Sequence, residues 1–155
     1  MEQAIILQNK KVARIGLTYH SKVPTTDQPK VTDSNLAYQV LLENWNQETI
    51  ELQESFIILL LTTAKRAHGL MVISTGGMAA TYVDAKLIFA AALSTRAHGI
   101  ILAHNHPSGN LKPSNHDRLL TQKLVEAGKI LDIPIFDHLI ITKSGYFSFA
   151  DEGIL

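Results

Sequence analysis

Two histidines form the pattern in this sequence with the clearest chemical meaning. His104 and His106 stand two residues apart, so in an extended backbone both imidazoles project to the same side. Two imidazoles on one side can bind one metal ion, and the end of a buried strand is where α/β folds often place their sites. An isolated His-x-His pair is still weak evidence, because two surface histidines at a strand end give the same pattern.

Asp117 is the third candidate ligand, and its local sequence allows two interpretations. Ser114 precedes it by three residues, and Ser-x-x-Asp ahead of an apolar stripe is typical of a capping box, which is all that most such pairs do. A strand, a short loop and a helix start can also return Asp117 to the two histidines. Because catalytic zinc sites have three protein ligands plus water, the pattern predicts one zinc ion per chain at His104, His106 and Asp117.

A water molecule activated by a metal still needs a base to take its proton, and a carboxylate on a neighbouring element is the natural candidate. Glu54 fits this role, because it stands at the start of the apolar run Phe56–Leu61, where a charge is otherwise out of place. The alternative, that Glu54 is simply the polar residue beside a strand, has equal support from the spacing. The metal is also left open, since His and Asp bind several divalent ions.

These residues must be positioned by secondary structure, which hydrophobic periodicity predicts along most of the chain. Two continuous apolar runs, Glu54–Leu61 and Gly99–His104, indicate strands that are covered on both faces. Shorter patterns predict further strands over Val12–Tyr19, Leu70–Ser74, Pro134–Thr142 and Tyr146–Phe149. Helical spacing and capping residues predict helices over Ser34–Trp45, Ala85–Thr95 and Ser114 to about Leu131, with Asp33 or Ser34 capping the first and Asp84 the second.

The order of these elements predicts a single α/β domain with a mixed sheet and helices packed on it. Ser21–Asp33, which contains Pro24 and Pro29, is expected to be a loop or a flexible arm. A length of 155 residues suits one domain, and a hydrophobic content of 46% is enough for a core. The charged content of 18% is below the usual quarter. We therefore expect much of the chain to be buried, either inside the domain or against a partner such as a second copy in a homodimer.

Charge and composition also limit the function classes. The 14 basic and 14 acidic residues balance, which disfavours a nucleic-acid-binding protein, because such proteins carry a basic excess. The absence of cysteine excludes disulfides and thiolate ligands and fits a reducing compartment. The longest apolar run is too short to span a bilayer, and the first residues lack the pattern of a signal peptide, so we expect a soluble, cytoplasmic protein without membrane association.

The stretch from His104 to Asp117 reads His-Asn-His-Pro-Ser-Gly-Asn-Leu-Lys-Pro-Ser-Asn-His-Asp, which resembles the JAMM motif of MPN-domain metalloproteases in its bacterial RadC-like form. The stretch from Glu54 to Leu61 is similar to the strand that carries the catalytic glutamate of this family. The resemblance continues through Leu120-Thr-Gln-Lys-Leu, Ala127-Gly, Asp137-His-Leu-Ile-Ile and Tyr146-Phe-Ser-Phe-Ala-Asp-Glu-Gly. It covers roughly residues 30 to 155, and a motif of this length and specificity does not arise by chance.

This resemblance implies a RadC-like MPN-type domain over residues 31–155, with a mixed sheet flanked by helices in cytidine-deaminase-like layers, and an N-terminal strand and arm over residues 1–30. It implies that His104, His106 and Asp117 bind one zinc ion. Glu54 would polarise the water and pass its proton to a leaving amine, and Ser114 would donate a hydrogen bond to the oxyanion. The implied reaction is hydrolysis of a peptide or isopeptide bond, with a catalytically silent binding scaffold and a DNA-repair-associated factor as the alternatives.

Some family properties are not implied for this chain. RadC-like proteins usually carry a helical N-terminal region that resembles helix-hairpin-helix DNA-binding modules, whereas only about thirty residues precede the domain here, so DNA binding rests on the family label alone. Relatives that cleave ubiquitin chains carry long insertions, which this sequence lacks, and the peptide or protein substrate stays open. For Asp137-His138, the sequence favours a buried polar pair that stabilises the sheet over a carboxylate that orients a ligand imidazole.

Overall fold

The structure is a computed structural model of the chain and describes Gly16, Tyr19 and residues 21–76 and 82–155. The strand expected over Val12–Tyr19 therefore lies almost entirely outside the described residues. Among the residues that are described, no helix is both long and apolar enough to cross a membrane.

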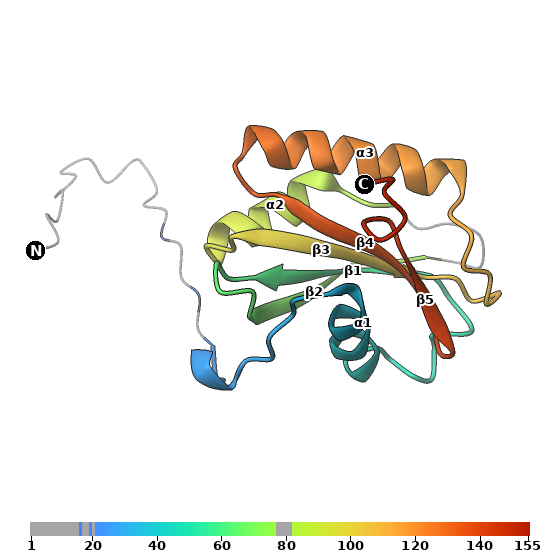
Figure 1. Cartoon of the computed structure of the whole chain (residues 1–155), viewed down its shortest axis with the longest axis horizontal. Coiled ribbons are helices and arrows are strands. Elements are labelled where there is room, and N and C mark those ends of the chain that lie inside the picture. Colours follow the sequence, from blue (N-terminus) through green and yellow to red (C-terminus); the bar gives the residue numbers. More distant parts are fainter. Residues whose placement is uncertain (1–15, 17–18, 20, 77–81) are drawn as a thin grey trace, which may run out of the picture.

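A mixed sheet forms the centre of the molecule, as Figure 1 shows. Within the described residues this sheet has five strands. The strands are β1 (Ser55–Leu61), β2 (Ala67–Thr75), β3 (Gly99–Asn105), β4 (Ile135–Thr142) and β5 (Gly145–Ser148). Their order across the sheet is β2-β1-β3-β4-β5. Strands β3 and β4 are parallel, whereas the β1–β2, β1–β3 and β4–β5 pairs are antiparallel. The predicted mixed sheet is thus confirmed.

Helices cover both faces of this sheet, which produces three layers (Figure 1). Helix α1 (Ser34–Glu43) packs on one face, while α2 (Ala85–Ser94) and α3 (Asn115–Ile130) cover the other. Successive residues of β1 and β3 alternate between the two cores, so every residue of both strands is buried. This explains why both strands appear in the sequence as continuous apolar runs rather than alternating ones.

The predicted helix caps are present. The Asp33 side chain accepts a hydrogen bond from the Leu36 backbone N–H at the start of α1, and the Asp84 side chain accepts one from Lys86 at the start of α2. These bonds satisfy backbone donors that the first turn of a helix leaves without a partner. Helix α1 ends at Glu43, two residues before the predicted end at Trp45.

The hairpin between β1 and β2 is tighter than the sequence predicted. Strand β2 begins at Ala67 rather than Leu70, because the chain reverses over Thr62–Arg66, where Lys65 has a positive φ of 59°. The segment expected to be a loop or arm also lies against this turn. The Val31 N–H donates to the Lys65 carbonyl over 2.7 Å, and the Ala67 N–H donates to the Pro29 carbonyl over 2.8 Å. A short 3-10 helix over Thr25–Asp27 precedes these contacts.

Candidate metal centre

The structure brings His104, His106 and Asp117 together at one end of the sheet. His104 lies near the end of β3, His106 follows the strand directly, and Asp117 lies in the first turn of α3. The Nε2 atoms of the two histidines are 3.0 Å apart. His104 Nε2 lies 3.4 Å from Asp117 Oδ1, and His106 Nε2 lies 3.7 Å from Asp117 Oδ2. His104 and Asp117 are buried, and His106 is partly buried.

This donor set fits a divalent cation. One ligand atom from each residue lies within 4.8 Å of the other two. Two ligand atoms bound about 2.0–2.1 Å from a tetrahedral zinc ion are separated by about 3.3 Å. The two Nε2 atoms are 3.0 Å apart, and they lie 3.4 and 3.7 Å from the two different oxygens of the Asp117 carboxylate. These separations are close to that spacing, so the three side chains could hold one metal ion with little movement.

Local sequence explains the position of Asp117. The Ser114 hydroxyl accepts a hydrogen bond from the Asp117 N–H over 3.1 Å, and Asp117 Oδ2 accepts one from the Ser114 N–H over 2.7 Å. This reciprocal pair is the capping box that the sequence predicted. The capping bond holds the carboxylate at the helix start, while its oxygens remain close to the two imidazoles. The same residue can therefore serve both of the roles that the sequence left open.

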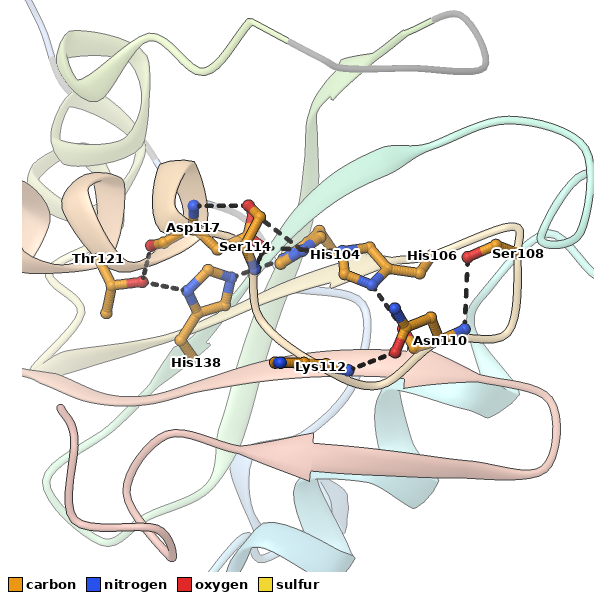
Figure 2. Close-up of polar contacts among 9 residues, drawn as sticks. All are labelled: His104, His106, Ser108, Asn110, Lys112, Ser114, Asp117, Thr121 and His138. Atoms are coloured by element: carbon orange, nitrogen blue, oxygen red, sulfur yellow. Dashed lines mark hydrogen bonds and ion pairs between the residues drawn. The ribbon is translucent and has the colours of Figure 1, made fainter.

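The loop after β3 sets the orientation of His106 (Figure 2). His106 Nδ1 lies 2.6 Å from the Asn110 carbonyl oxygen, which only accepts hydrogen bonds, so Nδ1 carries the proton. In the neutral imidazole this leaves the lone pair on Nε2, which faces His104 and Asp117. The chain turns through Gly109, whose φ of 77° suits a residue without a Cβ, and the Gly109 N–H donates to the His106 carbonyl over 2.9 Å.

The pKa values reflect a site that favours positive charge. The hydrogen bond with Asp117 raises the pKa of His106 above its usual value, although burial opposes this shift. Burial also tends to raise the pKa of Asp117, but the hydrogen bonds with His104, His106 and Ser114 outweigh it and hold that pKa far below its usual range. The carboxylate is thus ionised, and a proton or a metal ion can balance its charge.

Glu54 lies at the same end of the sheet. It directly precedes β1, whose residue Phe56 forms with His104 the last pair of the β1–β3 ladder, so Glu54 lies at the end of the sheet where His106 follows β3. Its side chain is half-buried, and its charge contributes to the raised pKa of His106. Ser114 is exposed at the start of α3, and its hydroxyl uses an oxygen lone pair, not its hydrogen, in the capping bond.

Asn105 links the candidate metal ligands to the segment that carries Glu54, and no pattern in the sequence indicated a role for it. Its side chain is fully buried and bonds to the backbone on both sides of Glu54. Asn105 Oδ1 accepts from the Ser55 N–H over 2.7 Å. Its amide nitrogen donates to the Gln53 carbonyl over 2.9 Å and to the Ile50 carbonyl over 2.6 Å. The residue between the two candidate ligands therefore holds the segment that carries Glu54.

His138 is the second residue whose position the sequence did not predict. The side chains of Asp137 and His138 do not pair, because alternation along β4 places them on opposite faces of the sheet. The bond between the two residues involves the His138 backbone N–H, which donates to Asp137 Oδ1 over 2.7 Å. Asp137 accepts bonds from the Ser148 hydroxyl and the Ala150 N–H, over 2.6 and 3.0 Å. His138 Nε2 instead lies 2.8 Å from His104 Nδ1. Burial lowers the pKa of His138 well below its usual value.

Comparison with known proteins decides the family. A family model described as the RadC-like JAB domain matches residues 31–154. The chain belongs to this family. The resemblance seen in the His104–Asp117 stretch is thereby confirmed, as is a single MPN-type domain as the fold.

Three curated proteins to which this RadC-like JAB domain is similar are each named UPF0758 protein. The one from Flavobacterium johnsoniae is 48% identical over 101 residues, which cover 65% of this chain and 44% of the relative. The one from Porphyromonas gingivalis is 40% identical over 138 residues, covering 86% of this chain and 60% of the relative. The one from Thermotoga maritima is 33% identical over 156 residues, covering 100% of this chain and 67% of the relative. The chain thus spans about half the length of the relatives it matches, and their names state no activity.

Proposed function

We propose that this RadC-like domain is a zinc-dependent hydrolase of peptide or isopeptide bonds. The observation that supports this proposal is the convergence of His104, His106 and Asp117, with Glu54 at the adjacent strand end and Ser114 at the adjacent helix start. A donor set with three protein ligands is typical of catalytic rather than structural zinc sites. For the relatives, which are longer than this chain, the same hydrolase activity is likewise a proposal.

Zinc, when bound by these three side chains, would supply a Lewis acid that polarises a carbonyl and lowers the pKa of a water molecule. His104, His106 and Asp117 would hold the ion with two neutral nitrogens and one carboxylate. The charge of that carboxylate is available at neutral pH, because the hydrogen bonds of Asp117 keep its pKa far below the usual range.

Glu54 would act as general base and general acid. It would accept a proton from the attacking water and deliver it to the nitrogen of the leaving amine, so that one side chain serves both transfers. Its half-buried position suits this role, because the carboxylate stays accessible to a substrate while Asn105 fixes the backbone on each side of it. Ser114 would donate its hydroxyl hydrogen to the oxyanion of the tetrahedral intermediate.

The test compares wild type with Glu54→Gln, which keeps the shape of the side chain but cannot take a proton. We expect about one zinc per chain in both proteins by elemental analysis, and cleavage of a peptide or isopeptide library by wild type only, with Glu54→Gln at least 100-fold slower. Glu51→Gln is the matched control, because Glu51 is exposed and pairs with Lys143 at the surface. Negligible cleavage by both zinc-loaded proteins would contradict the proposal and favour a binding scaffold. Absence of bound zinc after zinc addition would refute the metal centre itself.

A further inference from the structure

A chain of hydrogen bonds links two of the candidate ligands through residues that are not ligands themselves (Figure 2). His104 Nδ1 lies 2.8 Å from His138 Nε2. His138 Nδ1 lies 2.6 Å from the Thr121 hydroxyl, which lies 2.6 Å from the Asp117 carbonyl oxygen. The chain thus runs from the His104 side chain on β3 through β4 to the backbone of Asp117 in α3.

The direction of each hydrogen bond follows from the Thr121 end. A hydroxyl has one hydrogen, and the Asp117 carbonyl can only accept, so Thr121 donates to Asp117. The Thr121 oxygen must therefore accept from His138, which means that the proton of His138 is on Nδ1. The Asp117 backbone carbonyl, acting through the Thr121 hydroxyl, thus determines which nitrogen of His138 carries the proton.

The surroundings of His138 keep it to a single proton. The side chain is fully buried, with its ring 5.6 Å from the ring of Phe56 and stacked 4.8 Å from that of Phe149. Neither of its nitrogens contacts a carboxylate, since one faces the Thr121 hydroxyl and the other the His104 imidazole, so a second proton would create a buried charge without a counter-ion in contact. With its proton on Nδ1, His138 presents a lone pair on Nε2, and His104 Nδ1 must donate to it.

We infer that His138 is a positioning residue of the metal centre, which accepts a hydrogen bond from His104 Nδ1 and so holds the His104 Nε2 lone pair toward the metal. Thr121 acts one step further away by fixing the proton on His138. This inference rests on the proposed metal centre. Metal-binding histidines usually donate this second hydrogen bond to a carboxylate, a carbonyl or water. A neutral imidazole in that place orients the ligand without adding negative charge to the site.

The arrangement also couples the two elements that carry the ligands. His104 belongs to β3 and Asp117 to α3, and the chain of hydrogen bonds ties the side chain of one to the backbone of the other. Rotation of the His104 ring would break the bond to His138. The His104 ring is therefore fixed before a metal arrives, which reduces the ordering that binding requires.

The experiment compares Thr121→Val with Thr121→Ser. Valine keeps the shape of threonine without the hydroxyl, whereas serine keeps the hydroxyl. The matched control is Thr142→Val, because Thr142 is also buried and its hydroxyl also donates to a carbonyl, that of Gly145, over 3.0 Å, away from this chain of bonds. His138→Leu removes the acceptor itself.

Two measurements are made at fixed pH. Zinc affinity is measured by competition with a chromophoric chelator. In metal-free protein labelled with 15N-histidine, NMR reports which nitrogen of His104 carries the proton, with the signal assigned by its loss in His104→Gln. We expect the proton on Nδ1 in wild type, a fall in zinc affinity of about 10-fold in Thr121→Val, and one of about 10- to 100-fold in His138→Leu. Thr121→Ser and Thr142→Val should bind zinc within about threefold of wild type, because they keep the chain of bonds or lie outside it.

The outcomes separate this inference from the proposed function. If wild type binds zinc and Thr121→Val and His138→Leu bind it equally well, the inference is overturned while the metal centre stands. A proton on Nε2 of His104 in the metal-free wild type would overturn it as well. If wild type binds no zinc, the metal centre and the proposed function fail first. If His138→Leu fails to fold, the zinc affinities of Thr121→Val and Thr121→Ser still test the inference, because both substitutions are small.

Discussion

Replacement of Asn105 by alanine offers the sharpest test of how the site is assembled. The substitution removes three side-chain hydrogen bonds at once and leaves the Ile50 and Gln53 carbonyls and the Ser55 N–H without these partners. Each such bond contributes about 1 kcal/mol net. We therefore expect the free energy of unfolding to fall by about 3 kcal/mol, a large share of the 5–15 kcal/mol typical of a domain. Because these contacts flank Glu54, cleavage activity should fall as well.

The assay for Asn105→Ala is urea denaturation followed by fluorescence and circular dichroism. Asn44→Ala is the matched control, since the Asn44 side chain donates one exposed bond to the Val40 carbonyl over 2.8 Å, and its loss should cost less than about 1 kcal/mol. A free energy of unfolding within about 1 kcal/mol of wild type for Asn105→Ala would refute the reasoning, because it would mean that the buried bonds contribute almost nothing.

Three further predictions follow from the site and its helix. The pKa of His106 is higher in the folded, metal-free protein than in the unfolded chain, where it is about 6.5. Protonated His106 therefore stabilises the fold below that unfolded pKa, and this contribution is lost as the pH rises through the folded pKa. The stability lost in metal-free His106→Gln should therefore be greater at pH 6 than at pH 8, and an equal loss by urea denaturation would contradict it. Gly128→Ala places a Cβ 2.4 Å from the Ile133 carbonyl oxygen, so thermal unfolding should show destabilisation of about 1–3 kcal/mol. An unchanged unfolding midpoint would show that the backbone near Ile133 can move to accept the methyl group without loss of stability. Ser114→Ala removes the hydroxyl at the start of α3, so we expect a stability loss of about 1 kcal/mol together with slower cleavage, and retention of full activity would exclude the oxyanion role.

The sequence by itself determined the features that local rules control. The His-x-His spacing directs both imidazoles to one side of an extended chain, and the structure brings their Nε2 atoms to 3.0 Å. The capping box of Ser114 and Asp117 needs only three residues of helix, so its presence followed from residue types alone. The apolar runs over β1 and β3 likewise predicted strands buried on both faces, because burial selects side chains residue by residue.

Only the tertiary structure decided which distant residues support this site. Asn105 contacts residues about 50 positions earlier in the chain because β1 pairs with β3. His138 contacts His104 because β4 pairs in parallel with β3. Strand pairing and register depend on the packing of the whole sheet, and a shift by one residue would turn each side chain to the other face. The proton positions of His104 and His138 depend on the Thr121 bond to a carbonyl in a different element. Such hydrogen-bond directions exist only once helix and sheet have packed, so no local pattern in the sequence could specify them.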